Sequence, residues 1–102
     1  MHAIVEERLP QLRELCRRHH VARLALFGSA VGGRFDPVRS DLDFVVEYLP
    51  VREAMTMSAY FDFKEALERL FGREVDLVER AAVRNPYFRE ELEETQVQLY
   101  AA

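Results

Sequence analysis

The first quarter of the chain combines a helical spacing of apolar residues with a run typical of a strand. Four apolar positions recur every three or four residues, the period of an amphipathic α-helix: Val5, Leu9, Leu12 and Cys16. This spacing predicts a helix over residues 3–20, in which Pro10 either introduces a kink or marks the true start. The segment from Val21 to Phe27 is rich in apolar and aromatic residues and stops at Gly28, which favours a buried strand.

The middle of the chain predicts a short turn, a strand and a long helix. After Gly28 any helix must be short, because Gly32 and Gly33 end it. Leu42 to Tyr48 is typical of a second strand. A helix is then expected from Arg52 to Phe71, with Gly72 as its C-terminal cap. Its buried stripe would consist of Ala59, Phe63, Ala66, Leu67 and Leu70.

The C-terminal third predicts a strand, a helix and an edge strand. Residues Glu74 to Glu79 alternate charged and apolar side chains, which indicates a strand with one polar face. Pro86 opens a helix that reaches about Glu94, and Gln96 to Tyr100 is a possible edge strand. The order of elements predicts a single α/β or α+β domain over residues 1–102, with a small mixed sheet flanked by helices.

Composition restricts the class of protein further. Hydrophobic residues make up 49% of the 102 residues and there is one cysteine, so the chain can bury a core without disulfides. A net charge of -4 has the wrong sign for binding long nucleic acid. No apolar run approaches the roughly 20 residues of a membrane span, and the N-terminus lacks a signal-peptide pattern. We therefore expect a soluble, cytoplasmic protein with neither a membrane nor a long nucleic acid as partner.

The first candidate for chemistry is the turn after the first strand. Gly28 and Ser29 stand where this strand meets a short helix, so free backbone N–H groups and the helix dipole would attract phosphate oxygens. Glycine lets a phosphate approach the backbone, and the Ser29 hydroxyl can donate to it or simply cap the helix. By itself a Gly-Ser pair is a weak signal.

Three aspartates form the second candidate. Asp41 and Asp43 are two residues apart at the second strand and therefore point to one side, while Leu42 and Phe44 point into the core. Asp76 lies on the alternating strand and would join them if the two strands are neighbours. Closely spaced carboxylates repel each other unless a cation lies between them, and their oxygens suit Mg²⁺ or Mn²⁺.

Taken alone, the Asp41 and Asp43 pair fits a solvated sheet face better than a metal site. A solvated face, however, requires neither a Gly-Ser turn at the end of the preceding strand nor a third aspartate on the other alternating strand. Together these features favour phosphoryl or nucleotidyl transfer with two metal ions.

The same residues resemble a known family. Phe27-Gly28-Ser29, eleven intervening residues, Asp41-Leu42-Asp43 and then Asp76 are similar to the signature of the DNA polymerase beta-type nucleotidyltransferases. Over nearly its whole length the chain most closely resembles the minimal nucleotidyltransferases, small antitoxins often encoded beside a HEPN-domain partner.

The resemblance implies a role for each site residue. Gly28 and Ser29 would hold the outer phosphates of ATP. Asp41 and Asp43 would hold two divalent metal ions, and Asp76 would hold one of them and help deprotonate the attacking hydroxyl. Nucleoside monophosphate, expected to be AMP, would pass to a tyrosine of a HEPN toxin, with which the chain would form a hetero-oligomer.

Position 30 departs from this pattern. Many relatives carry an arginine directly after the Gly-Ser pair, where this chain has Ala30, so a phosphate contact is missing. We expect Arg34 or Arg39 of the following loop to replace that charge, and Ser40 completes the expected nucleotide-binding set. A non-catalytic antitoxin that neutralises its partner by binding is therefore the alternative function. Transfer to a small molecule fits less well, because relatives with that activity carry an additional domain.

The long helix carries a second apolar face. At about 100° per residue, Phe61 lies roughly 160° and Met57 roughly 120° from Phe63, so neither shares the core stripe. We expect both side chains to be exposed and to dock another protein, unless the loop at Leu49 to Val51 folds over them.

Overall fold

The computed structural model describes all residues, 1–102, and contains one mixed four-stranded sheet with the strand order β3-β2-β1-β4. The strands are β1 (Val21–Phe27), β2 (Leu42–Tyr48), β3 (Val75–Glu79) and β4 (Val97–Ala101). Strand β1 is antiparallel to both of its neighbours, whereas β2 and β3 run parallel. The α+β class, the mixed sheet and the C-terminal edge strand are thus as predicted.

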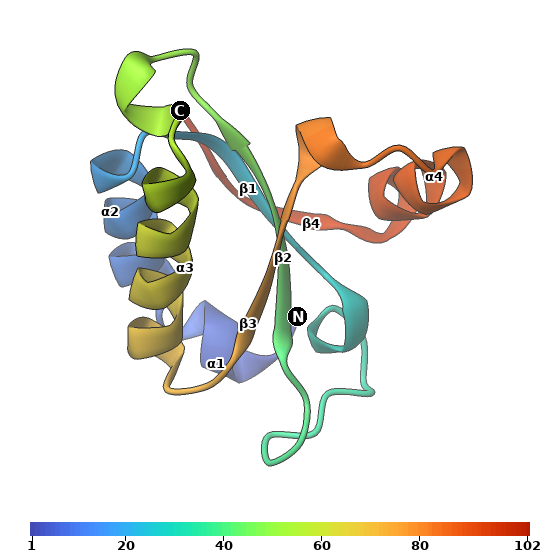
Figure 1. The fold of residues 1–102 in the computed structure, drawn as a ribbon. Coiled ribbons are helices and arrows are strands. Elements are labelled where there is room, and N and C mark those ends of the chain that lie inside the picture. Colours follow the sequence, from blue (N-terminus) through green and yellow to red (C-terminus); the bar gives the residue numbers. More distant parts are fainter.

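Helices cover the two faces of the sheet unequally (Figure 1). On one face lie α2 (Leu9–Arg18) and α3 (Met57–Phe71), preceded by the single turn α1 (Ala3–Glu6). On the other face lies α4 (Pro86–Thr95). Short 3-10 turns, η1 (Gly28–Ala30), η2 (Arg52–Ala54) and η3 (Arg80–Ala82), connect these elements. None of the helices is both long and apolar enough to cross a membrane.

The main core lies between the sheet and the α2 and α3 helices. Leu42 and Phe44 of β2 are fully buried there, as the strand pattern predicts, and so is Phe63 of α3. Burial of each such side chain contributes roughly 1.5–3 kcal/mol. A smaller apolar cluster occupies the opposite face, under α4, and contains Ala25, Val45, Val83 and Leu92.

The prediction of one helix over residues 3–20 is wrong, because two helices occupy this segment. Helix α1 ends at Glu6 and α2 starts at Leu9, which places Pro10 in the first turn. A proline is tolerated there because the first turn needs no amide donor. The structure therefore selects the alternative in which Pro10 marks the helix start. The helix also ends early, since His20 has a left-handed φ of 59° and turns the chain into β1.

The helix predicted from Arg52 is also shorter than expected. Residues Arg52–Ala54 form only a 3-10 turn, and α3 begins at Met57. Thr56 sets this start because its hydroxyl accepts a hydrogen bond from the Ala59 N–H at 3.1 Å. The predicted end is correct: Gly72, with φ 64°, follows Phe71 and caps the helix.

The last two elements match their predictions closely. Helix α4 starts at Pro86 and reaches Thr95, one residue past the expected end. Asn85 caps it, because its side-chain oxygen accepts from the Tyr87 N–H at 2.9 Å. Strand β4 then pairs only with β1 and forms one edge of the sheet.

Candidate active site

The sheet face opposite the main core is divided along its length into three parts. Alternate residues of β2 point to this face: Asp43, Val45 and Glu47. Asp43 belongs to a carboxylate cluster at one end, Val45 to the small apolar cluster in the middle, and Glu47 to an ion-pair network at the other end. The carboxylates thus share a face with apolar side chains rather than lying on a uniformly solvated surface.

Asp43 and Asp76 are direct neighbours across the parallel strands. They are register partners in the β2 and β3 ladder, which confirms that the two strands lie side by side. The alternation on β3 ends after Asp76, because Val78 on the same face packs against the middle apolar cluster. The predicted polar face of this strand is therefore polar only at the end that holds Asp76.

The Gly28 turn lies directly against the Asp43 carboxylate. Phe27, the last residue of β1, is the register partner of Asp43, so the chain turns at Gly28 beside that side chain. Gly28 has a φ of +74°, and a Cβ atom built on it would lie 2.3 Å from Asp43 Oδ2. Only glycine fits this position, and the backbone of the turn therefore reaches the carboxylate with no side chain between them.

Crowding of carboxylates changes the acidity of Asp43. Burial is the largest cause, followed by the negative charge of Asp76, a side-chain hydrogen bond to Asp76 and the charge of Asp41. Together they raise the pKa of Asp43 to about 6. Each of these causes favours the neutral carboxyl group, so a cation that neutralised the cluster would relieve a real repulsion.

The fit of this cluster to a metal ion rests on its donor chemistry. Asp43 and Asp76 are the close pair, while Asp41 is exposed and immediately precedes β2. As the side chains are placed, no three carboxylate, imidazole or thiolate groups are arranged to hold one metal ion. Carboxylate oxygens are nevertheless the ligands that Mg²⁺ prefers. The pair therefore fits a hard divalent cation, with Asp41 at hand as an additional carboxylate.

A polar pocket of about 470 Å³ adjoins the Gly-Ser turn. It is lined by Gly28, Ser29, Val31, Gly32, Gly33, Arg34, Glu91 and Thr95. Two of the predicted phosphate-binding residues, Gly28 and Ser29, thus share one cavity with the guanidinium-bearing Arg34. Two α4 residues, Glu91 and Thr95, complete its wall, and no pattern in the sequence pointed to them.

Position 30 cannot supply a charge to this pocket. Ala30 is fully buried and belongs to the main core, so a longer charged side chain there would displace packed atoms. Of the two arginines expected to compensate, Arg34 lines the pocket, whereas Arg39 is exposed and does not. The geometry thus favours Arg34 over Arg39.

Ser40 is engaged within its own loop. Its hydroxyl accepts a hydrogen bond from the Asp36 N–H at 2.9 Å, and its N–H donates to the Asp36 carbonyl at 2.9 Å. The Asp36 side chain in turn accepts from the Val38 N–H at 2.8 Å. Ser40 therefore closes the turn before Asp41, a role that the sequence prediction did not include. The Asp36-Pro37 pair, a common turn signal, was the clue.

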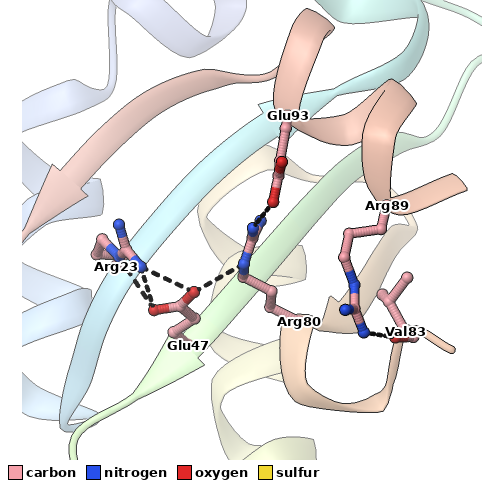
Figure 2. A network of polar contacts seen from close by, with 6 residues as sticks. All are labelled: Arg23, Glu47, Arg80, Val83, Arg89 and Glu93. Carbon is pink, nitrogen blue, oxygen red and sulfur yellow. Dashed lines mark hydrogen bonds and ion pairs between the residues drawn. The ribbon is translucent and has the colours of Figure 1, made fainter. Parts of the chain in front are cut away.

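An ion-pair network lies at the far end of the same face (Figure 2). Glu47 of β2 accepts from Arg23 of β1 at 2.9 Å and from Arg80 of η3 at 3.0 Å, and Arg80 also pairs with Glu93 of α4. Exposed pairs contribute at most about 1 kcal/mol each. Because the network joins β1, β2, η3 and α4, it helps to fix α4 on the sheet, and α4 lines the pocket beside the Gly-Ser turn.

The second apolar face of α3 is exposed, as predicted. Met57 is 78% exposed and Phe61 is 50% exposed, so the Leu49 to Val51 loop does not cover them. They line an apolar groove of about 640 Å³ that runs along β3. Its other lining residues are Tyr48, Ala54, Met55, Thr56, Tyr60, Leu77, Val78, Glu79 and Ala82.

Comparison with known proteins agrees with this geometry. The family model described as nucleotidyltransferase domain matches residues 9–97, which include the turn and all three aspartates. The chain belongs to the nucleotidyltransferase family. Within this family it is a minimal nucleotidyltransferase, as the resemblance predicted.

Individual relatives of this nucleotidyltransferase cover most of its length. A provisionally named protein adenylyltransferase of Methanocaldococcus jannaschii is 32% identical over 94 residues, which are 84% of this chain and 92% of that protein. A solved structure, provisionally named a minimal nucleotidyltransferase, shares 31% identity with a TM-score of 0.78 and 95% coverage of both chains.

A more distant structure shares the fold. It is the complex of a tri-AMPylated HEPN toxin of Shewanella oneidensis with an MNT antitoxin, and the similar chain has a TM-score of 0.68 at 17% identity. The match covers 95% of this nucleotidyltransferase and 72% of that chain. At this identity the likeness establishes a common fold.

Proposed function

We propose that this chain transfers AMP from ATP to a hydroxyl group on a partner protein. The observation that supports it best is the Asp43 and Asp76 pair, held on adjacent parallel strands directly against the Gly28 turn. Phosphates bound at the turn would therefore lie next to the carboxylates, which is the arrangement that nucleotidyl transfer needs.

Phosphate binding and proton transfer fall to different residues of the site. The Gly28 and Ser29 turn, together with Arg34, binds the outer phosphates in the polar pocket, because N–H groups, a hydroxyl and a guanidinium are all donors to phosphate oxygens. Asp76 accepts the proton of the acceptor hydroxyl. The hydroxyl oxygen then bonds to the α-phosphorus, the bond between the α-phosphorus and its bridging oxygen breaks, and pyrophosphate leaves.

The carboxylates would hold the metal ions of this reaction. Asp41 and Asp43 would hold the two ions, and Asp76 would hold one of them. When bound, Mg²⁺ or Mn²⁺ supplies positive charge that neutralises the carboxylates and polarises the phosphate.

We infer that the acceptor is a tyrosine of a HEPN toxin, which the chain neutralises as its antitoxin. The inference is supported by the named AMPylated toxin complex that shares this fold. The exposed groove at Met57 and Phe61 supports a protein acceptor as well. Three of its lining residues, Leu77, Val78 and Glu79, lie on β3, the strand that also carries the proposed base Asp76. A partner seated there would contact the strand that carries Asp76.

A purely binding antitoxin is the second candidate function. The buried Ala30, which leaves position 30 without a phosphate contact, favours it. It predicts that the complex forms equally well without nucleotide or metal, and that no AMP is incorporated.

Two measurements test the proposal. Calorimetry should show ATP binding that is at least about tenfold tighter with Mg²⁺ than with a chelator, because unneutralised carboxylates repel the triphosphate. Incubation with labelled ATP, Mg²⁺ and the proposed HEPN partner should label that partner, and the Asp43→Asn variant should not. Equal ATP affinity in both buffers, or an unlabelled partner in a stable complex, would leave the binding-only function.

A further inference from the structure

Arg73 links the start of β3 to the loop of residues 35–40, which directly precedes Asp41. This residue follows the capping Gly72 and is partly buried. Its guanidinium donates to the Ser40 carbonyl at 3.2 Å and to the Pro37 carbonyl at 2.9 Å. One side chain therefore holds two backbone acceptors in the segment just before Asp41.

The same guanidinium also holds the base of the loop. Its central carbon lies 5.0 Å from the ring centroid of Phe35, which is a cation–π arrangement. Phe35 is nearly buried and its ring lies 4.6 Å from that of His2. The loop is thus anchored on one side by the core and on the other by Arg73.

The loop has little else to hold it to β3. Its internal bonds between Asp36 and Ser40 close the turn on itself but do not connect it to the sheet. The backbone ladder that joins β2 to β3 begins only at Leu42, whose register partner is Val75 and whose N–H donates to the Glu74 carbonyl at 3.4 Å. Arg73 therefore supplies the side-chain hydrogen bonds that tie the loop before Asp41 to the start of β3.

Arginine at position 73 carries a free-energy cost, which indicates that the shape of its guanidinium group matters there. The Arg73 Nε atom is buried without a hydrogen-bond partner. An unsatisfied buried donor costs roughly 1–3 kcal/mol. A lysine would avoid this cost, yet its single ammonium lacks the planar fork that reaches two carbonyls and stacks on an aromatic ring.

We propose that Arg73 is a positioning residue that holds the 35–40 loop and so places Asp41 against the Asp43 and Asp76 pair. The role of Asp41 rests on the proposed function, whereas the hold on the loop does not. Displacement of a reacting group by about 1 Å can lower a rate by about a hundredfold, so loss of this hold should reduce transfer well beyond its effect on stability.

The test compares Arg73→Ala and Arg73→Lys with Arg13→Ala. Arg13 is a matched control because its guanidinium also donates to a backbone carbonyl, that of Leu99 at 3.2 Å, but on the opposite edge strand. Trypsin reports the loop directly, since Arg39 is an exposed cleavage site within it and Arg34 is an exposed site just before it. All digests and assays are run at least about 20 °C below the melting temperature of each variant, so that global unfolding is negligible.

We expect Arg73→Ala to be cleaved after Arg39 at least about tenfold faster than the wild type, with Arg73→Lys intermediate and Arg13→Ala unchanged. AMP transfer by the folded Arg73→Ala should fall about tenfold to a hundredfold. Added guanidinium ion at low millimolar concentration should restore part of both properties to the alanine variant and none to the lysine variant.

Unchanged cleavage after Arg39 in Arg73→Ala would overturn the proposal, because the loop would then be held without it. If Arg73→Ala is cleaved faster after Arg39 but transfers AMP at the wild-type rate, Arg73 holds the loop but does not position Asp41 for the reaction. If the wild type itself transfers no AMP, the proposed function fails. The positioning role is then tested by calorimetric measurement of Mn²⁺ binding in place of the AMP-transfer assay. Equal Mn²⁺ affinity in wild type and Arg73→Ala would then refute the positioning role.

Discussion

Gly28 and Asp43 are packed so closely that a single methyl group between them would overlap the carboxylate. The virtual Cβ of Gly28 lies 2.3 Å from Asp43 Oδ2 and 3.1 Å from its Cγ. The contact explains why a glycine with φ +74° follows β1, and it brings the turn proposed to bind phosphate within reach of the carboxylate cluster. Substitutions at either residue should therefore have distinct and measurable effects.

Gly28→Ala should nearly abolish AMP transfer and lower the melting temperature. The left-handed backbone alone costs an alanine about 1–2 kcal/mol, and the overlap must also push Asp43 aside. This corresponds to a fall of roughly 5–15 °C for a domain of this size. Gly72→Ala is the matched control, because Gly72 shares the left-handed backbone, with φ +64°, but nothing lies within 4 Å of its Cβ. An active, fully stable Gly28→Ala would show that the turn and the carboxylate move independently.

Asp43→Asn should stabilise the metal-free protein at pH 8 and not at pH 4. In the folded state the pKa of Asp43 is raised to about 6 by burial and by Asp76, above its usual value of about 4. Below pH 4 the carboxyl is neutral in both states and costs nothing. As the pH rises through 4 to 6, the folded protein loses stability because it must ionise this group, and asparagine removes that loss.

After allowance for partial solvent screening the gain is about 1 kcal/mol, a few degrees in melting temperature. Scanning fluorimetry in chelator across pH 4 to 8 measures it. Glu65→Gln, which removes an exposed carboxylate of α3, reports the effect of net charge alone. A gain at pH 8 no larger than that of Glu65→Gln would contradict the crowding of carboxylates at Asp43.

Asp76→Asn should lower kcat at least about a hundredfold while leaving the affinity for ATP within about threefold. The expected split follows from its proposed work on the acceptor hydroxyl rather than on the phosphates. Glu74→Gln is the control, because its side chain is exposed and it precedes the same strand. Wild-type turnover in Asp76→Asn would place this residue on the sheet surface outside the reaction, and a lost affinity for ATP would assign it to nucleotide binding.

Met57→Glu and Phe61→Glu should weaken binding of the HEPN partner at least about tenfold without lowering the melting temperature. Both side chains are already exposed, so a charge on them disturbs little of the folded chain but would be buried in a complex. Tyr87→Glu is a suitable control because Tyr87 is 81% exposed and lies outside the groove. Unchanged partner affinity in both variants would move the interface to another face.

Local signals in the sequence determined most of the elements. Asn85-Pro86 and Gly72 set helix ends that the structure reproduces, because caps and turns depend on a few adjacent residues. The errors lie where two local signals compete. Helical periodicity continues through Pro10 and Thr56, yet each of these residues starts a helix of its own, so periodicity alone extended both helices too far.

Some features of the candidate site also follow from local sequence, and others follow only from the tertiary structure. Alternation along each strand determined that Asp43 and Asp76 leave the core and that Leu42 and Phe44 enter it. Tertiary structure alone decided that β2 and β3 run side by side with these two aspartates in register, since strand pairing joins segments far apart in the chain. It also decided the contact between Gly28 and Asp43, the burial of Ala30 and the reach of Arg73 to the loop. These depend on distances between distant segments, and no periodicity within one segment contains them.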